Sequence, residues 1–187
     1  MEDIGEECFE ELVSKTFFHH TSDYYSMHNL MHELAQCVAG EFCYKLDDSN
    51  PSSFTEGSVR YVSYLQGIYD NFEQFEIYSH CEQLMTFLPF KFSPVDDLES
   101  IITSAVKKLL SKPKHLRVFS LARYPIDLLP NSIGDLMHLR YFDFSETPIL
   151  SLPDSIVSLY NLETLLLAGC TKLTLLPSNT SKLVNLR

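Results

Sequence analysis

The second half of the chain repeats itself at a nearly constant interval, and this feature restricts the fold more than any other. Similar segments begin at Leu116, Leu139, Leu162 and Leu186, so the successive steps are 23, 23 and 24 residues. Apolar residues follow the leading leucine at the third and fifth positions of the first three segments: Phe119 and Leu121, Phe142 and Phe144, Leu165 and Leu167. A period of this length predicts a solenoid, because one unit can bury its apolar side chains only against stacked neighbours.

The spacing inside each unit predicts one short strand followed by an irregular outer segment. Apolar residues two positions apart on a strand point to the same side, so their side chains can enter a shared core. Each unit then contains a Leu-Pro pair, at 129–130, 152–153 and 176–177. Proline lacks the N–H that a sheet requires, so these pairs are expected outside the sheet. Residues 116–187 are therefore predicted to form an array of repeats of the α/β class, a solenoid with parallel strands on its concave face.

The first 48 residues show a different order of elements, with a helix, a hairpin and a second helix. The predicted elements are a helix over 3–16, a hairpin over 17–20 and 24–27, a helix over 30–39 and a strand over 42–46. Asn29 is the expected N-cap of the second helix, and Gly40 is its expected C-terminal stop. This order matches the end of a winged-helix domain, which we assign to residues 1–48.

The middle of the chain, residues 49–115, is interpreted as a linker followed by irregular repeats. The run Ser-Asn-Pro-Ser-Ser at 49–53 is typical of a linker. The repeat spacing returns imperfectly at Val59 and Val62 and again at Leu84 and Phe87, which predicts irregular strands that cap the solenoid. Between them and the regular repeats, apolar residues over 97–110 recur at helical spacing.

The charge of the chain restricts its partners. The sequence has 14 Lys and Arg against 25 Asp and Glu, a net charge of −11, which argues against nucleic acid or an anionic membrane as the partner. The N-terminal segment is acidic and resembles no targeting signal, and no apolar run of about 18 residues predicts a transmembrane segment. Five cysteines without a framework spacing are expected to be reduced thiols, which favours a cytoplasmic location.

Six runs of residues allow comparison with a known family. Two come from the first part of the chain, EDIGEECFEELVSKTFF and YSMHNLMHELAQCVAGEFCYKL, and four come from the rest, SVRYVSYL, LMTFLPF, LRVFSLARYPIDLLPNSIGDLMHLRYFDFS and LLLAGCTKLTLLP. In these runs the chain resembles plant disease resistance proteins of the coiled-coil, nucleotide-binding, leucine-rich-repeat class (NB-ARC-LRR). The first two are similar to the end of that family's nucleotide-binding module, and the other four are similar to the start of its leucine-rich repeats. The resemblance implies a cytosolic immune receptor that rests with ADP bound and becomes an ATP-bound oligomer when it triggers defence.

The resemblance also implies a nucleotide contact. Met27-His28-Asn29 takes the place of the family's Met-His-Asp motif, so His28 is implied to contact the β-phosphate of ADP in a full-length receptor. Asn29 occupies the third position of this motif, the latch position that is implied to help hold the ADP-bound resting state, where the family usually has Asp. The phosphate loop G-x-x-x-x-G-K-[ST] does not occur in this sequence, so the chain by itself is expected to hold no cofactor and to catalyse no reaction. His28 and His32 lack the H-E-x-x-H order, and no metal site is predicted.

Charged and aromatic residues between the core positions of the repeats are the candidate partner-binding residues: Arg117, Arg123, Arg140, Tyr141, Asp143, Glu146 and Glu163. Their partner would be a protein, either a pathogen effector, a guarded host protein or the receptor's own switch module. Two functions stay open at this point. The chain is a fragment of an immune receptor that acts by protein recognition and autoinhibition, or a generic intracellular leucine-rich-repeat scaffold. The array stops inside a fourth unit, so a longer parent protein is expected.

Overall fold

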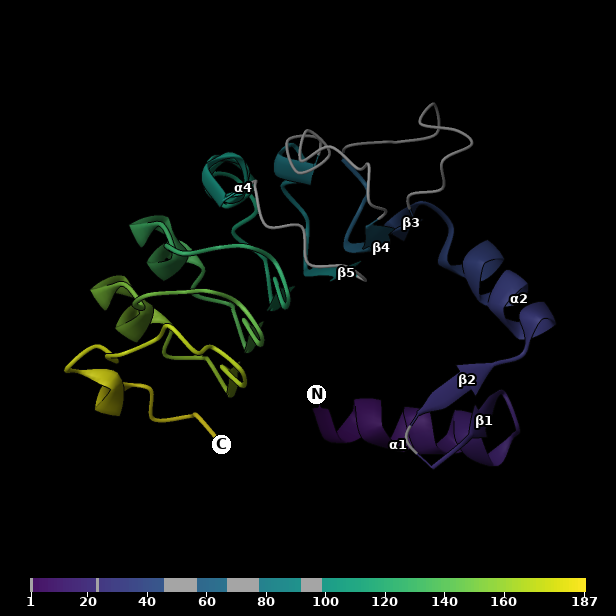
Figure 1. Ribbon diagram of the computed structural model, residues 1–187. Helices are drawn as coiled ribbons and strands as arrows, with labels where there is room; N and C mark the ends of the chain where they lie inside the picture. The colour runs from purple at the N-terminus through teal and green to yellow at the C-terminus, as the bar shows by residue number, and fades with distance from the viewer. Residues whose placement is uncertain (1, 23, 46–56, 67–77, 92–98) are drawn as a thin grey trace. The chain divides into compact units, whose positions relative to one another are not determined.

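The computed structural model describes residues 2–22, 24–45, 57–66, 78–91 and 99–187 (Figure 1). Contacts between residues divide the chain into two units, Met1–Gly40 and Glu41–Arg187, which we call unit 1 and unit 2. Each unit has its own secondary structure.

Unit 1 consists of two helices joined by a hairpin, as the sequence predicts. Its elements are α1 (Glu2–Ser14), β1 (Phe18–His20), β2 (Tyr25–Met27) and α2 (Asn29–Ala39). After α1 the chain reverses through Thr16, whose φ of 61° is left-handed, while the N–H of Phe17 donates to the carbonyl of Leu12. The ring of Phe9 then packs on β1 and β2, 5.2 Å from the ring of Phe18 and 4.9 Å from that of Tyr25.

The prediction that Asn29 is the N-cap of α2 is wrong, because His28 takes that position. His28 has extended backbone angles, φ −62° and ψ 141°, and its Nδ1 accepts a hydrogen bond of 3.3 Å from the N–H of Leu30. Asn29 is instead the first helical residue. An imidazole nitrogen can accept a hydrogen bond from an unpaired N–H two residues later, as the shorter Asn side chain does at other helix N-termini. The predicted stop at Gly40 is confirmed, with φ 52° and its N–H bonded to the carbonyl of Gln36.

Unit 2 is built on a parallel sheet whose strands follow chain order. The strands of its described part are β3 (Cys43–Lys45), β4 (Tyr61–Gln66), β5 (Thr86–Lys91), β6 (Val118–Ser120), β7 (Tyr141–Asp143) and β8 (Thr164–Leu166). The register follows the repeat, since Val118 is opposite Tyr141 and Tyr141 is opposite Thr164. The irregular strands expected near 59–64 and 84–87 are therefore confirmed as β4 and β5, and the predicted fold class is confirmed.

The strand predicted over 42–46 forms, but it belongs to the repeat sheet and not to the N-terminal unit. A short 3₁₀ helix, η1 (Gly40–Phe42), leads into β3, which pairs in parallel with β4 from Cys43 opposite Tyr61 to Lys45 opposite Ser63. Unit 1 accordingly ends at Gly40. The domain boundary that the sequence placed after Asp48 lies outside the described residues. A three-residue apolar alternation carries no information about which sheet it will join, so the sequence could not make this distinction.

The segments that follow strands β6, β7 and β8 cross the opposite side of unit 2, here called the outer side (Figure 1). They contain the 3₁₀ helices η3 (Asn131–Asp135), η4 (Asp154–Ser158) and η5 (Thr180–Lys182), and α4 (Glu99–Leu109) lies on the same side. Pro130 and Pro153 immediately precede η3 and η4, as expected of a residue that cannot join a sheet. Gly134 in η3 allows close stacking, because a Cβ built there would lie 2.6 Å from the Ser155 carbonyl oxygen of η4.

The core of unit 2 lies between the sheet and the outer side. The predicted core positions of the first two regular repeats are fully buried: Leu116, Phe119, Leu121, Leu139, Phe142 and Phe144. Aromatic rings continue from one repeat to the next, with centroids 5.8 Å apart for Phe87 and Phe119 and 5.6 Å apart for Phe119 and Phe142. Leu165 and Leu167 of the third repeat are only partly buried against this core.

We predict that Phe142→Ala lowers the unfolding free energy of unit 2 by about 3 to 5 kcal/mol, because it leaves a cavity beneath two neighbouring repeats. Arg140→Ala, two residues earlier, removes a half-buried ion pair and should cost less than about 1 kcal/mol. Urea denaturation of the two variants measures both values. Equal losses would show that the strand faces the other way.

Candidate functional site

The candidate site lies on the surface of the sheet that faces away from the core, here called the sheet face. A hollow of about 650 Å3 opens there across β5, β6, β7 and the residues that follow them. Its described lining residues are Leu88, Pro89, Val118, Ser120, Ala122, Arg123, Tyr141, Asp143, Ser145 and Glu146. Equivalent positions of two consecutive repeats thus supply most of the lining, because the parallel register sets them side by side.

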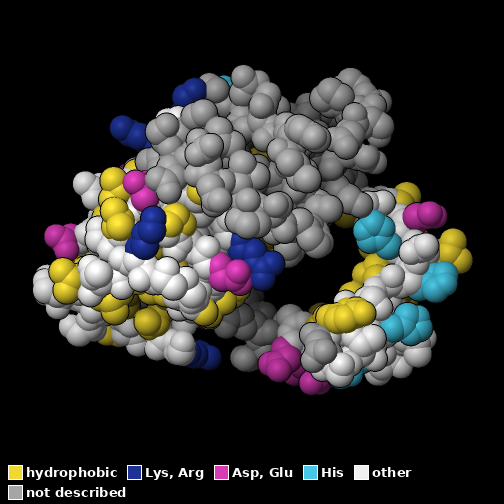
Figure 2. All heavy atoms as spheres, in the orientation of Figure 1, with side chains coloured by type: hydrophobic (Ala, Val, Ile, Leu, Met, Phe, Trp, Pro, Cys, Tyr) yellow, Lys and Arg dark blue, Asp and Glu magenta, His cyan; other side chains and the backbone are white. Residues whose placement is uncertain are grey.

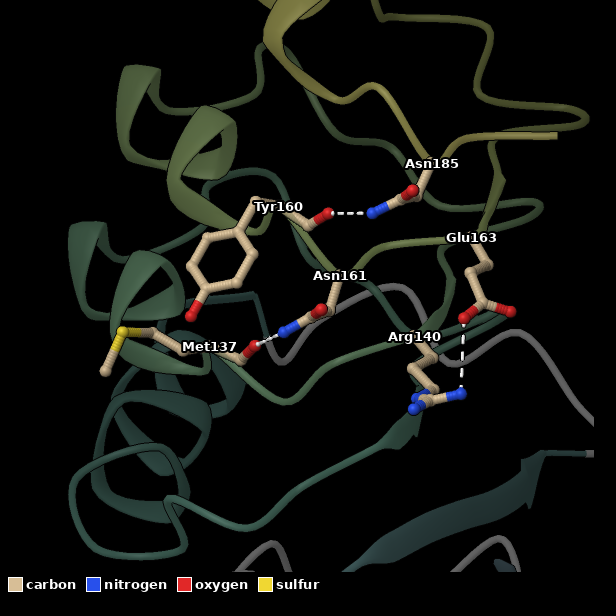
Figure 3. Close-up of polar contacts among 6 residues, drawn as sticks. All are labelled: Met137, Arg140, Tyr160, Asn161, Glu163 and Asn185. Atoms are coloured by element: carbon tan, nitrogen blue, oxygen red, sulfur yellow. Dashed lines mark hydrogen bonds and ion pairs between the residues drawn. The ribbon is translucent and has the colours of Figure 1, made fainter. Parts of the chain in front are cut away.

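Two ion pairs cross from one repeat to the next on this face. Arg123 Nη2 lies 3.0 Å from Glu146 Oε1 at the rim of the hollow, and both side chains are exposed. Arg140 Nη1 lies 3.3 Å from Glu163 Oε1, with both side chains less exposed (Figure 3). Pairs of this kind contribute little to stability in water. Their main consequence is that these four charges are already neutralised within the sheet face.

The Arg123–Glu146 pair is held by the backbone as well as by charge. Arg123 and Glu146 occupy equivalent positions after their strands, and both have left-handed φ values, 66° and 59°. Gly169 takes the next equivalent position with φ 74°. A left-handed conformation is costly for residues with a Cβ, so the turn geometry of the repeat, rather than the preference of these two residues, sets their orientation.

Asp143 is the central acid of the hollow. Its Oδ1 accepts a hydrogen bond of 2.8 Å from the N–H of Ser145, and its Oδ2 lies 3.5 Å from the Ser120 hydroxyl of the preceding repeat. Both oxygens are therefore oriented by neutral groups. Burial raises the pKa of the neighbouring Tyr141 hydroxyl, and the negative charge of Asp143 raises this pKa further. Tyr141 is consequently a neutral phenol at ordinary pH.

The structure brings together four of the seven predicted partner-binding residues. Arg123, Tyr141, Asp143 and Glu146 line the hollow, whereas the lining contains none of the other three, Arg117, Arg140 and Glu163. The six remaining described lining residues were not predicted from the sequence. Val118 and Ser120 could have been found, because they precede Tyr141 and Asp143 by one repeat.

A row of residues immediately before each leading leucine has a structural role instead. Asn161 Nδ2 donates to the carbonyl of Met137 at 2.6 Å, and Asn185 Nδ2 donates to the carbonyl of Tyr160 at 2.6 Å (Figure 3). The earlier repeats have His115 and His138 at this position, with stacked rings whose centroids are 5.9 Å apart. These contacts tie each repeat to the preceding one and lie outside the hollow.

Comparison with protein families agrees with the geometry of both units. A family model described as a leucine-rich repeat region matches residues 74–187. The chain belongs to the leucine-rich-repeat family. A second model, described as the winged helix domain of disease resistance proteins, matches residues 1–35. The order of the two matches confirms the predicted resemblance to plant nucleotide-binding leucine-rich-repeat resistance proteins.

Two curated relatives from Arabidopsis thaliana have names that refer to disease resistance. This chain is 40% identical to At3g14460 over 178 residues, which cover 92% of the chain, and 37% identical to RPP13-like protein 1 over 130 residues, which cover 70%. In both comparisons the chain spans 12% of the relative's length. The chain therefore corresponds to a small part of such a resistance protein, and the activities of the whole protein are matters for proposal.

A similar solved structure is the functional domain of InlJ from Listeria monocytogenes. It has a TM-score of 0.46 and 12% sequence identity, and the match covers 76% of this chain and 35% of that one.

The second predicted site, His28, lies in the unit that matches the resistance-protein winged helix. Figure 2 shows histidine side chains gathered over unit 1, where His19, His20, His28 and His32 are exposed. Because Nδ1 of His28 accepts the hydrogen bond from Leu30, the neutral ring carries its proton on Nε2. Nε2–H is therefore the donor that a phosphate oxygen could use. Asn29 is exposed beside it.

The described ranges hold no group of three or more His, Cys, Asp or Glu residues arranged to bind a metal ion. Among these residues, none of the helices has both the length and the apolar character needed to cross a bilayer.

We predict that Asp143→Asn lowers the pKa of Tyr141, because it removes the negative charge that opposes ionisation of the phenol. Burial, the larger cause, remains, so the pKa should still exceed the ordinary value of 10.0. NMR titration of the labelled tyrosine ring carbons measures the change. An unaltered Tyr141 pKa in the variant would place the carboxylate away from the phenol.

Proposed function

We propose that this chain is the part of a plant intracellular immune receptor in which a leucine-rich-repeat surface recognises a protein, without catalysis of its own. The observation that carries the proposal is the hollow on the sheet face, which combines a fixed carboxylate, a neutral phenol and apolar side chains. Such a mixture is typical of binding surfaces, where aromatic and apolar contacts supply affinity and a few oriented polar groups supply specificity.

The charges of the sheet face favour binding over chemistry. Glu146 and Glu163 are neutralised by arginines, and the Asp143 carboxylate is oriented by a backbone N–H. A Ser120 hydroxyl lies near Asp143, but the described lining includes no histidine or lysine that could act as its base. The arrangement supports a recognition role for a pathogen effector, a guarded host protein or the receptor's own switch module in the cytoplasm.

Unit 1 is proposed to serve the nucleotide switch of the longer receptor. On α2, Leu30, Leu34 and Val38 follow one another at intervals of four residues and are 64%, 50% and 78% exposed. One face of this helix is thus apolar and exposed within unit 1. We propose that it packs against the remainder of the nucleotide-binding module, where His28 Nε2 would donate to the β-phosphate of ADP and hold the receptor in autoinhibition.

The alternative of a generic scaffold has less support. A scaffold requires only the repeats, whereas this chain also carries the winged-helix match over residues 1–35 and relatives named for disease resistance. These observations favour the receptor.

A chimeric receptor tests the recognition role. This chain replaces the matching segment of At3g14460, and cell death is measured in leaves that express the chimera. We expect the double variant Tyr141→Ala, Asp143→Asn to alter the response, because it removes two lining residues of the hollow. Tyr160→Ala, an exposed tyrosine outside the hollow, is the matched control and should behave as the parent. A double variant that cannot be distinguished from this control would contradict the proposal.

Nucleotide binding gives a separate test of the switch role. We expect calorimetry to detect no ADP binding to the chain alone, since His28 is one contact and the phosphate loop is missing. In the chimera, His28→Ala should reduce ADP retention. Asn29→Asp should increase it, because a negative charge at the start of α2 stabilises the helix by about 0.3 to 1 kcal/mol. Micromolar binding by the chain, or indifference of the chimera to both substitutions, would remove His28 from the nucleotide site.

A further inference from the structure

We propose that the hollow of the sheet face binds an arginine side chain presented by the partner protein. The inference rests on the proposed recognition function and adds the chemistry of the residue that is recognised. It follows from three features of the hollow, namely its net charge, the orientation of its carboxylate and the nature of its wall.

The described lining of the hollow carries a net negative charge that is located at Asp143. Its charged residues are Arg123, Glu146 and Asp143, and the first two neutralise each other at 3.0 Å. The contacts of Asp143 within the described chain are to neutral groups, the Ser145 N–H and the Ser120 hydroxyl. Among the described residues, no cation pairs with this carboxylate, and a basic side chain of a partner can supply one.

The orientation of Asp143 suits a guanidinium group in particular. A carboxylate has about four acceptor positions on its two oxygens. The hydrogen bond from Ser145 occupies one of them, and the more distant Ser120 hydroxyl orients the second oxygen. Acceptor positions stay available on both oxygens of a carboxylate that is already fixed in place. The two parallel N–H groups of a guanidinium match such a pair, whereas a lysine ammonium is a more strongly hydrated point charge.

The wall of the hollow suits the rest of an arginine side chain. Leu88, Pro89 and Val118 provide apolar surface on one side, against which the methylene groups can pack. Tyr141 provides an aromatic ring that remains uncharged, and a guanidinium stacks favourably on such a ring. A volume of about 650 Å3 accommodates the long side chain together with the backbone that carries it.

The test uses a small probe, N-acetyl-arginine methylamide, with N-acetyl-citrulline methylamide as its uncharged isostere. Both are titrated into the isotope-labelled 187-residue chain and followed by NMR. We expect the arginine probe to shift the amide signals of Tyr141 and Ser145, and the citrulline probe to leave them unchanged at the same concentration. Equal shifts with both probes, or shifts confined to other surfaces, would overturn the proposal.

A matched pair of variants locates the contact. Asp143→Asn can still accept the hydrogen bond from Ser145, so the turn is retained, but the affinity for the arginine probe should fall about tenfold or more. Asp154→Asn changes an exposed acid at the start of η4 on the outer side and should leave the affinity unchanged. Equal effects of the two substitutions would indicate general charge attraction and would contradict a specific site.

The probe experiment and the chimera separate the two proposals. The double variant Tyr141→Ala, Asp143→Asn could alter the cell-death response of the chimera while the chain shows no preference for the arginine probe over the citrulline probe. In that case the recognition role is supported and the arginine assignment is wrong. Alternatively, the arginine probe could bind specifically while the double variant leaves the cell-death response of the chimera unchanged. In that case the arginine site is supported and its proposed role in the receptor is wrong.

Discussion

Unit 2 depends on a backbone contact that recurs at the second residue of each repeat. The carbonyl of Arg117 accepts hydrogen bonds from the N–H groups of Arg140 and Tyr141, at 2.8 and 3.0 Å. The carbonyl of Arg140 accepts in the same way from Glu163 and Thr164, at 2.8 and 2.9 Å. Each repeat is thereby placed about 4.8 Å from the preceding one, whatever the side chains at these positions.

This backbone register gives the sheet face its chemical arrangement. Leu121 and Phe144 each donate their N–H to the following repeat, to the carbonyls of Asp143 and Leu166. The turn that comes next places Arg123 opposite Glu146, while beneath it the rings of Phe142 and Phe144 meet at 4.3 Å. A packed aromatic core thus supports a polar surface whose residues have little freedom to move apart. Such support is what a binding surface on a solenoid requires.

The repeats could be predicted from the sequence because their apolar residues recur at a nearly constant spacing. A spacing of 23 residues places Phe119 and Phe142 in one core and Val118 and Tyr141 on one surface, without knowledge of any contact. The two predictions that were wrong each depended on a few residues with no repeat to support them. His28 replaced Asn29 as N-cap because an imidazole can also accept from the helix start, and β3 joined the repeat sheet because three residues do not specify a partner strand. Four of the ten described lining residues of the hollow were predicted. Of the six that were missed, Leu88 and Pro89 come from a repeat whose spacing is irregular, and the other four are uncharged residues of the regular repeats.

The most direct test of this account is amide hydrogen exchange of the intact chain, measured by NMR at increasing urea concentration. The account predicts that the amides of Arg117, Arg140 and Glu163, which donate to Met85, Arg117 and Arg140, belong to the slowest class and lose protection together. Exchange of these amides as fast as that of the exposed residues of unit 1, or loss of protection at a separate urea concentration for each repeat, would contradict a single sheet that holds the binding surface in place.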